Sequence, residues 1–135
     1  MKKFFSTNYS DTAFSIAMFV LRTGMGLLMM PHGYSKLVHF AEYKDNFMNF
    51  LGLGGTISLA LVIFAEFFCS IFVMLGLFTR LSSLVLVIST GVALFKAHNG
   101  DLFGKGEHAA LFMAGFLVLL LVGPGKASLD KLMGK

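Results

Sequence analysis

Seven side chains of types that bind polar ligands or carry protons lie within or next to apolar runs of this sequence. They are Arg22, His32, Lys36, Glu66, His98, Glu107 and His108. Arginine and lysine donate hydrogen bonds, ionised carboxylates accept them, and histidine can do either. Such a set could hold a polar headgroup, and its carboxylates and imidazoles could relay protons.

Arg22 and Glu66 each lie near the middle of an apolar run. A charge at the centre of a membrane-spanning helix costs about 2.5–3.5 kcal/mol, so residues of this kind are functional candidates by default. If the two runs form antiparallel helices, the charges lie at matching depth and pairing would offset part of both costs. Two interpretations stay open: an ion pair that fixes helix register, and a pair that handles protons or binds a headgroup. Depth alone does not show that the two helix faces meet.

His32 and Lys36 are four residues apart and therefore share one helix face. Pro31 lies directly before them and is expected to bend the helix and free a backbone carbonyl. A bent helix with a histidine and a lysine on one face is a candidate pocket wall. The alternative is that Lys36 extends to the membrane surface while His32 bonds a neighbouring carbonyl.

A further polar cluster follows the third apolar run and contains His98, Asp101, Glu107 and His108. Histidines and carboxylates can bind divalent metals, but this spacing matches no metal motif, so we expect no metal site. Glu107 can instead match the positive end of the helix that it begins. The runs on either side are short, which favours a polar pocket at this membrane face.

The composition indicates an integral membrane protein that forms one domain, residues 1–135. Of these residues 56% are hydrophobic and 13% are charged, and a soluble fold of this length could not bury so much apolar surface. The net charge of +4 comes from scattered residues rather than a basic stripe, so we expect lipid as the partner and no nucleic acid.

The predicted fold class is an all-α membrane protein, an antiparallel bundle of four transmembrane helices. The spans are expected at about 13–37, 57–77, 81–97 and 107–122, with an interfacial amphipathic helix at about 40–51 and a cytoplasmic tail at 123–135.

Local signals set the ends of these elements. Gly76 is expected to end the second helix and Thr79 to cap the third. Pro124, between two glycines, stops the fourth, and Ser128 could cap a short final helix. One set of loops and termini carries six basic residues and the other four, which favours both termini in the cytoplasm.

Several short motifs, in this order and spacing, resemble the DoxX family of small four-helix membrane proteins. They are Leu21-Arg22 with Gly26, His32-Gly33, Lys36-Leu37, Glu66, Gly76-Leu77-Phe78-Thr79-Arg80, His98, Gly123-Pro124-Gly125 and Ser128-Leu129-Asp130. The resemblance implies a multi-pass protein of the bacterial inner membrane. Some members of that family are described as subunits of a thiosulfate:quinone oxidoreductase, and others as quinol oxidase subunits.

We therefore expect a quinone-interacting or accessory subunit of a membrane redox complex, with quinone as its cofactor. The sequence has no haem, flavin or metal signature, so a soluble or membrane redox partner would exchange the electrons. Two alternatives stay open. One is a non-catalytic membrane scaffold that recruits soluble enzymes. The other is a small transporter, which would need to form a homo-oligomer because four spans enclose little space.

Overall fold

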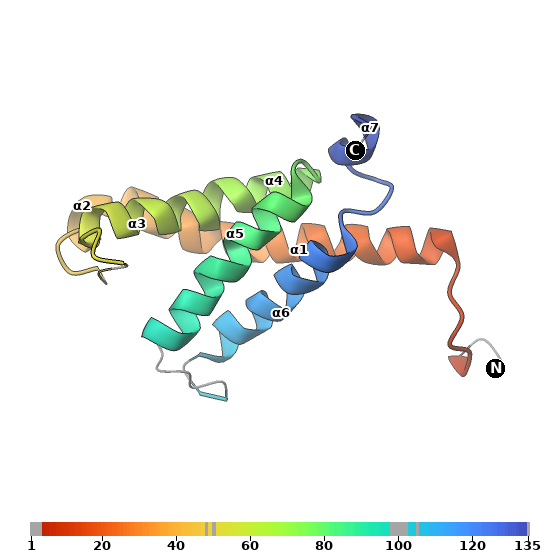
Figure 1. Ribbon diagram of the computed structural model, residues 1–135, viewed down its shortest axis with the longest axis horizontal. Helices are drawn as coiled ribbons and strands as arrows, with labels where there is room; N and C mark the ends of the chain where they lie inside the picture. Colours follow the sequence, from red (N-terminus) through yellow and green to blue (C-terminus); the bar gives the residue numbers. More distant parts are fainter. Residues whose placement is uncertain (1–3, 48, 50, 98–102, 105, 135) are drawn as a thin grey trace.

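The computed structural model describes residues 4–47, 49, 51–97, 103–104 and 106–134, and within them all regular structure is helical. The elements are α1 (Asp11–Val38), α2 (Phe40–Tyr43), α3 (Gly55–Ile63), η2 (Phe64–Cys69), α4 (Ser70–Leu75), α5 (Thr79–Val92), η3 (Ala93–Ala97), α6 (Glu107–Val122) and α7 (Leu129–Leu132) (Figure 1). The two η elements are π-helical segments, each continuous with an α-helix before it.

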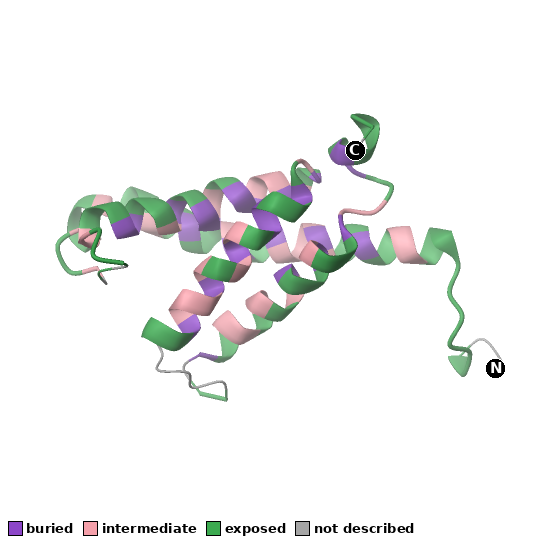
Figure 2. Ribbon diagram, in the orientation of Figure 1, coloured by how far each residue is buried: buried purple, intermediate pink, exposed green. Residues whose placement is uncertain are grey.

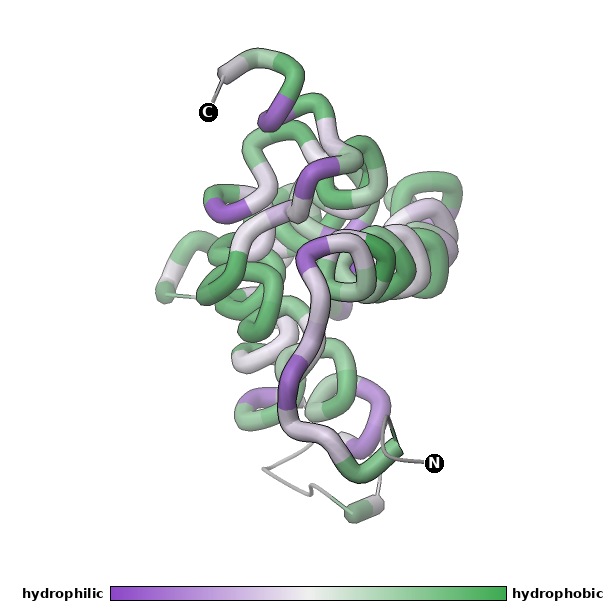
Figure 3. The backbone as a smooth tube through the Cα atoms, turned by 90° about the vertical axis from the view of Figure 1, so that its right-hand side faces the viewer, coloured by the Kyte–Doolittle hydropathy of each residue, from purple (hydrophilic) through white to green (hydrophobic). Residues whose placement is uncertain are grey.

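Three helices are long and apolar enough to cross a bilayer: Asp11–Val38, Gly55–Leu75 and Thr79–Lys96. The fourth apolar helix, α6, has 16 residues and is shorter than the roughly 20 that a span of average thickness needs. The expectation of an all-helical membrane protein is therefore met, with three spans on the criteria of length and composition. In Figure 3 hydrophobic residues colour most of each long helix, in keeping with helices that face lipid.

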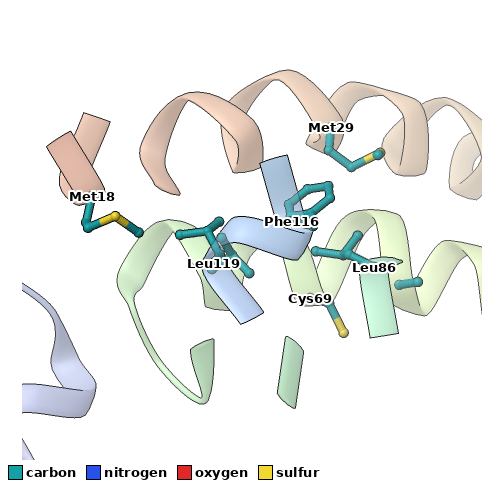
Figure 4. Close-up of a cluster of buried hydrophobic side chains, with 8 residues drawn as sticks. Met18, Met29, Cys69, Leu86, Phe116 and Leu119 are labelled. Carbon is teal, nitrogen blue, oxygen red and sulfur yellow. The ribbon is translucent and has the colours of Figure 1, made fainter. Parts of the chain in front are cut away.

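The helices form two antiparallel pairs (Figure 1). In the first pair α1 lies along the continuous rod of α3, η2 and α4, and in the second α5 lies along α6. The second pair crosses the first obliquely, and buried residues follow the inner side of each helix (Figure 2). Eight buried side chains from all four long helices form the core: Met18, Met29, Ala65, Cys69, Val73, Leu86, Phe116 and Leu119 (Figure 4).

Two glycines on one face of α1 allow its backbone to lie directly against the rod. A side chain at Gly33 would place its Cβ atom 2.5 Å from the backbone nitrogen of Phe67, and one at Gly26 would place it 2.7 Å from the carbonyl oxygen of Ser70. These positions are seven residues apart, two helical turns, and so face the same neighbour. Small residues at a contact are the usual means by which helices approach closely in lipid.

The turn between α4 and α5 joins the two helix pairs. The prediction for Gly76 in this turn is confirmed, and the prediction for Thr79 is not. Gly76 ends α4 in the left-handed conformation, with φ of 71°. Thr79 was expected to cap α5 with its side chain, but that prediction is wrong. The backbone N–H groups of Phe78 and Thr79 instead donate to the carboxylate of Asp130, at 2.7 and 2.8 Å. The cap therefore comes from the far end of the chain.

The predicted interfacial helix at 40–51 is mostly absent. Helix α2 ends at Tyr43, and the described residues that follow form turns in which Asn46 donates to the carbonyl of Tyr43 at 3.2 Å. Asp45 and Asn46 explain the stop, because their side chains compete with the helix for backbone hydrogen bonds. Further along, the side-chain oxygen of Asn49 accepts from Gly54 N at 2.8 Å, another local bond between a side chain and the backbone.

Candidate functional site

Lys36 and Glu66 form an ion pair between α1 and η2, with 2.6 Å between the lysine Nζ atom and the glutamate Oε2 atom. The glutamate side chain is 11% exposed and the lysine side chain 25%. Gly33 lies one turn before Lys36, and its close contact with the η2 backbone brings the two side chains within reach. The charge on Glu66 thus has a direct partner inside the helix bundle.

Glu66 lies in the π-helical segment η2, which interrupts an otherwise α-helical rod. The wider turn changes the direction in which successive side chains point, and such segments often occur at functional sites. The hydroxyl of Ser70 donates to the carbonyl of Glu66 at 2.6 Å, which satisfies a backbone oxygen inside this turn. A second π-helical segment, η3, continues α5 at the same end of the bundle.

A cavity of about 150 Å³ lies beside the ion pair, where the two helix pairs meet. It is lined by Met29, His32, Lys36, Glu66, Thr90, Ala93, His108, Ala109 and Phe112. The structure thus brings together His32, Lys36, Glu66 and His108, which come from α1, η2 and α6. We call these four residues the ion-pair site. The ring of His32 lies edge-on to that of Phe112, with 5.7 Å between centroids.

A second cavity, of about 410 Å³, shares His32 and Lys36 with the first and is also lined by Pro31, Ser35 and Tyr43. Helix α1 continues through Pro31, so this residue does not end the helix. The ion-pair site is therefore open on the side that faces α2. A ligand could contact the pair from this cavity and extend away along α1.

Arg22 does not pair with Glu66, so that hypothesis is wrong. Its Nη1 atom donates to the carbonyl of Pro124 at 2.9 Å and its Nη2 atom to that of Ala127 at 2.6 Å. Arg22 is 2% exposed, and its guanidinium also lies over the ring of Phe19, 5.3 Å from the centroid. Backbone carbonyls and an aromatic face thus stabilise this charge at the opposite end of the bundle from Glu66.

The segment that binds Arg22, residues 124–130, also holds the turn between α4 and α5. Besides accepting from that turn through its carboxylate, Asp130 donates its own backbone N–H to the carbonyl of Gly76 at 2.8 Å. The charges of Arg22 and Asp130 attract each other. We call this segment the C-terminal clamp, because it joins α1, the α4–α5 turn and the end of α6. Its short helix α7 begins after Ser128, whose side chain accepts from Lys131 N at 3.2 Å, as expected.

Two further predicted site residues are not among the four of the ion-pair site. Glu107 is exposed in the first turn of α6 and lines neither cavity. His98 lies outside the described residues. Among the residues that the structure does describe, no three His, Cys, Asp or Glu side chains lie together in a way that could hold a metal ion.

Three residues at these sites were not singled out from the sequence as site residues. Thr90 is buried at the cavity wall, where its hydroxyl donates to the carbonyl of Leu86 at 2.8 Å. Phe112 lies against His32, four residues after the predicted His108 and so on the same face of α6. Asp130 was named only as part of a family motif. That it caps α5 depends on how the chain folds back, which the sequence does not show.

Comparison with known proteins confirms the resemblance to the DoxX family. The sequence model of the DoxX family matches residues 17–99, which include Arg22 and three members of the ion-pair site. The chain is also similar to the inner membrane protein YqjF of Escherichia coli strain K12. The two are 30% identical over 126 residues, which cover 89% of this chain and 94% of the relative. No solved structure matches the chain.

Proposed function

Because the chain belongs to the DoxX family, we propose that it is a multi-pass protein of the bacterial inner membrane whose ion-pair site binds the headgroup of a quinone. The observation that supports this most is the Lys36–Glu66 pair, 2.6 Å apart, beside a cavity that two histidines also line. Ionisable residues inside a membrane protein commonly mark proton or ligand sites. Here they surround a space in which a ligand fits.

The cavity suits a small ring with polar groups at its edge. A volume of about 150 Å³ is roughly what one benzene-sized ring occupies. Phe112 offers an aromatic face, while Lys36 and the two histidines would donate hydrogen bonds to carbonyl oxygens. A bound quinone supplies a centre that takes up electrons together with protons. Glu66 would accept and release a proton close to that centre, and His32, which lines both cavities, would exchange it with solvent.

We further propose that the chain acts as a subunit, with a partner protein exchanging the electrons. In this proposal the side chains of the ion-pair site move protons and orient the ligand, while the partner protein carries the electrons.

The test is binding of ubiquinone-1 and of a short-chain menaquinone to the purified protein in mild detergent, measured by isothermal titration calorimetry. We expect the His32→Ala/Glu66→Gln variant to bind at least about tenfold more weakly than wild type. The matched control is His39→Ala/Glu42→Gln, since both residues are exposed and line neither cavity. Equal binding by wild type and the His32/Glu66 variant, including equally poor binding, would overturn the proposal.

We also propose four spans, with α6 as the fourth and both termini in the cytoplasm. Helix α6 lies antiparallel to α5 along its length (Figure 1). At 16 residues it is about 24 Å long, and a modest local thinning of the bilayer accommodates the difference.

In a Cys69→Ser background, single cysteines at Ser6, Phe103 and Met133 report the topology. A membrane-impermeant maleimide should label only Phe103→Cys in spheroplasts. Labelling at both Phe103→Cys and Met133→Cys would show that α6 does not cross, whereas labelling at Ser6→Cys and Met133→Cys alone would show the opposite orientation.

A further inference from the structure

A cavity of about 580 Å³ lies at the end of the bundle opposite the ion-pair site, between the start of α5, the end of α6 and the C-terminal clamp. Two cations line it, Arg80 and Lys131, and both side chains are exposed. Arg80 makes one long hydrogen bond, from its Nη2 atom to the carbonyl of Val122 at 3.3 Å. Neither cation forms an ion pair with a described residue. Most of their hydrogen-bonding capacity is therefore available to a ligand.

Among the described residues that line this cavity, Asp130 is the one with a carboxylate, and its oxygens are bonded within the fold. It is buried, and its two oxygens accept from the backbone of Phe78 and Thr79. It is also attracted to the buried guanidinium of Arg22. The negative charge is thus compensated within the fold, and the cavity presents a positive charge outward. Because those first amides of α5 are already bonded, the helix terminus itself contributes little to this charge.

Apolar side chains continue the cavity toward the lipid-facing surface. Leu81 is 63% exposed, Phe78 45% and Val122 39%, although all three are strongly apolar. They lie at the ends of two apolar helices, the level at which a bilayer places its phosphates. A ligand matching this surface has an anionic head for Arg80 and Lys131 and a hydrocarbon part for Leu81 and Val122. Phospholipids of net negative charge have both, and basic pockets between helices at a membrane surface bind them.

We propose that this cavity binds the headgroup phosphate of an anionic phospholipid. The planar guanidinium of Arg80 can donate two parallel hydrogen bonds to phosphate oxygens, and Lys131 adds a second charge. The acyl chains follow Leu81 and Val122 into the bilayer. This site is separate from the proposed quinone site, so either proposal can fail without the other.

The experiment compares retention of phosphatidylglycerol and of phosphatidylcholine with identical acyl chains, measured by native mass spectrometry of the protein released from mild detergent. Wild type should retain phosphatidylglycerol in preference. A basic side chain near anionic lipid contributes about 1 kcal/mol, so each lost cation should weaken binding about fivefold and Arg80→Gln/Lys131→Gln about thirtyfold. The matched control, Lys44→Gln/Lys96→Gln, removes the same charge from residues outside the cavity and the C-terminal clamp, and it should bind as wild type does.

Four results would overturn the proposal. Equal retention of the two lipids by wild type would show no headgroup preference, and equal loss in the control variant would show a diffuse charge effect. If inorganic phosphate binds with the same dependence on Arg80 and Lys131 and displaces the lipid at millimolar concentration, the site takes small anions instead. Should the double variant unfold, Lys131→Gln alone is tested, because the side chain of Lys131 is exposed. Unchanged lipid retention in that variant would also contradict the proposal.

Discussion

At the scale of single residues, Lys36 and Arg22 represent two ways of stabilising a cation inside a membrane protein. Lys36 has a carboxylate at 2.6 Å and a partly exposed side chain. Arg22 has two backbone carbonyls and an aromatic face, with Nε unpartnered among the described residues. The planar guanidinium of arginine has five donors and can bond several carbonyls at once. The compact ammonium of lysine is instead well matched to a single carboxylate. The two charges therefore respond differently to the loss of a partner.

Substituting Lys36 by methionine should destabilise the protein by about 1–3 kcal/mol, because it leaves the carboxylate of Glu66 unpaired in a largely buried position. The partial exposure of Lys36 keeps this below the cost typical of a fully buried pair. Lys36→Met/Glu66→Leu should recover most of the loss, since an apolar pair needs no compensation. Urea unfolding in detergent measures both effects. Lys96→Met, an exposed lysine elsewhere, should change stability little. A double variant less stable than the single one would contradict this account.

At the scale of elements, the contact between α1 and the η2 segment determines where the ion pair lies. Gly33 permits this contact, and the π-helical turn of η2 places Glu66 at it. Helix α5 depends in a different way on a remote element, because its first amides are capped by Asp130 from the C-terminal clamp. Each of these helices is thus positioned partly by a segment distant in sequence.

Gly33→Ala should separate α1 from η2, since the new methyl group would lie 2.5 Å from the backbone nitrogen of Phe67. Overpacking of this kind costs about 1–3 kcal/mol. The melting temperature and the affinity for quinone should both fall as Lys36 moves away from Glu66. Gly24→Ala is the control on the same helix, because no atom lies within 4 Å of its new methyl group. That change should be neutral or slightly stabilising, and equal effects at the two glycines would contradict the packing argument.

Asp130→Ala should cost about 1–2 kcal/mol, because it removes the cap of α5 and leaves two N–H groups without their acceptor. Hydrogen exchange should increase at the first turn of α5 before it does elsewhere. Asp45→Ala removes the same charge from an exposed turn and serves as the reference. If both variants lose the same stability, the cap is not the cause.

At the scale of the whole molecule, the two helix pairs are joined at one end and open at the other. The C-terminal clamp ties α1 to the α4–α5 turn and the end of α6, while the cavities of the ion-pair site lie at the other end. The core of eight apolar side chains lies between these ends (Figure 4). The C-terminal clamp therefore holds one end of the fold together, and the ion-pair site lies at the other end.

Deleting residues 123–135 should strongly reduce the amount of folded protein in the membrane, because Arg22 loses both carbonyl partners and α5 loses its cap. Removing one partner of a buried charge typically costs about 3–5 kcal/mol. Membrane levels by immunoblot and resistance to protease measure the loss. Deleting only 133–135 should have little effect. Arg22→Met should partly rescue the longer deletion, and no rescue would show that Arg22 is not the main cause.

Local signals in the sequence predicted the parts of this structure that depend on neighbouring residues. The spacing of His32 and Lys36 placed both on one face of α1, and Gly76 ended its helix as expected. The partner of Arg22 could not be predicted, because it depends on a chain path that returns after more than 100 residues. The same holds for the cap that Asp130 supplies to α5. The π-helical turn at Glu66 has no pattern of its own in the sequence, so its pairing with Lys36 was also missed.

The distance in sequence between Arg22 and its partners also has a consequence for biosynthesis. Pro124 and Ala127 follow Arg22 by 102 and 105 residues. At about 5–20 residues per second, the ribosome makes them roughly 5–20 s after Arg22. During this time the first helix holds a guanidinium whose two carbonyl partners have not yet been made. The environment of Arg22 in the first helix is therefore completed only when carbonyls made 102 and 105 residues later reach it.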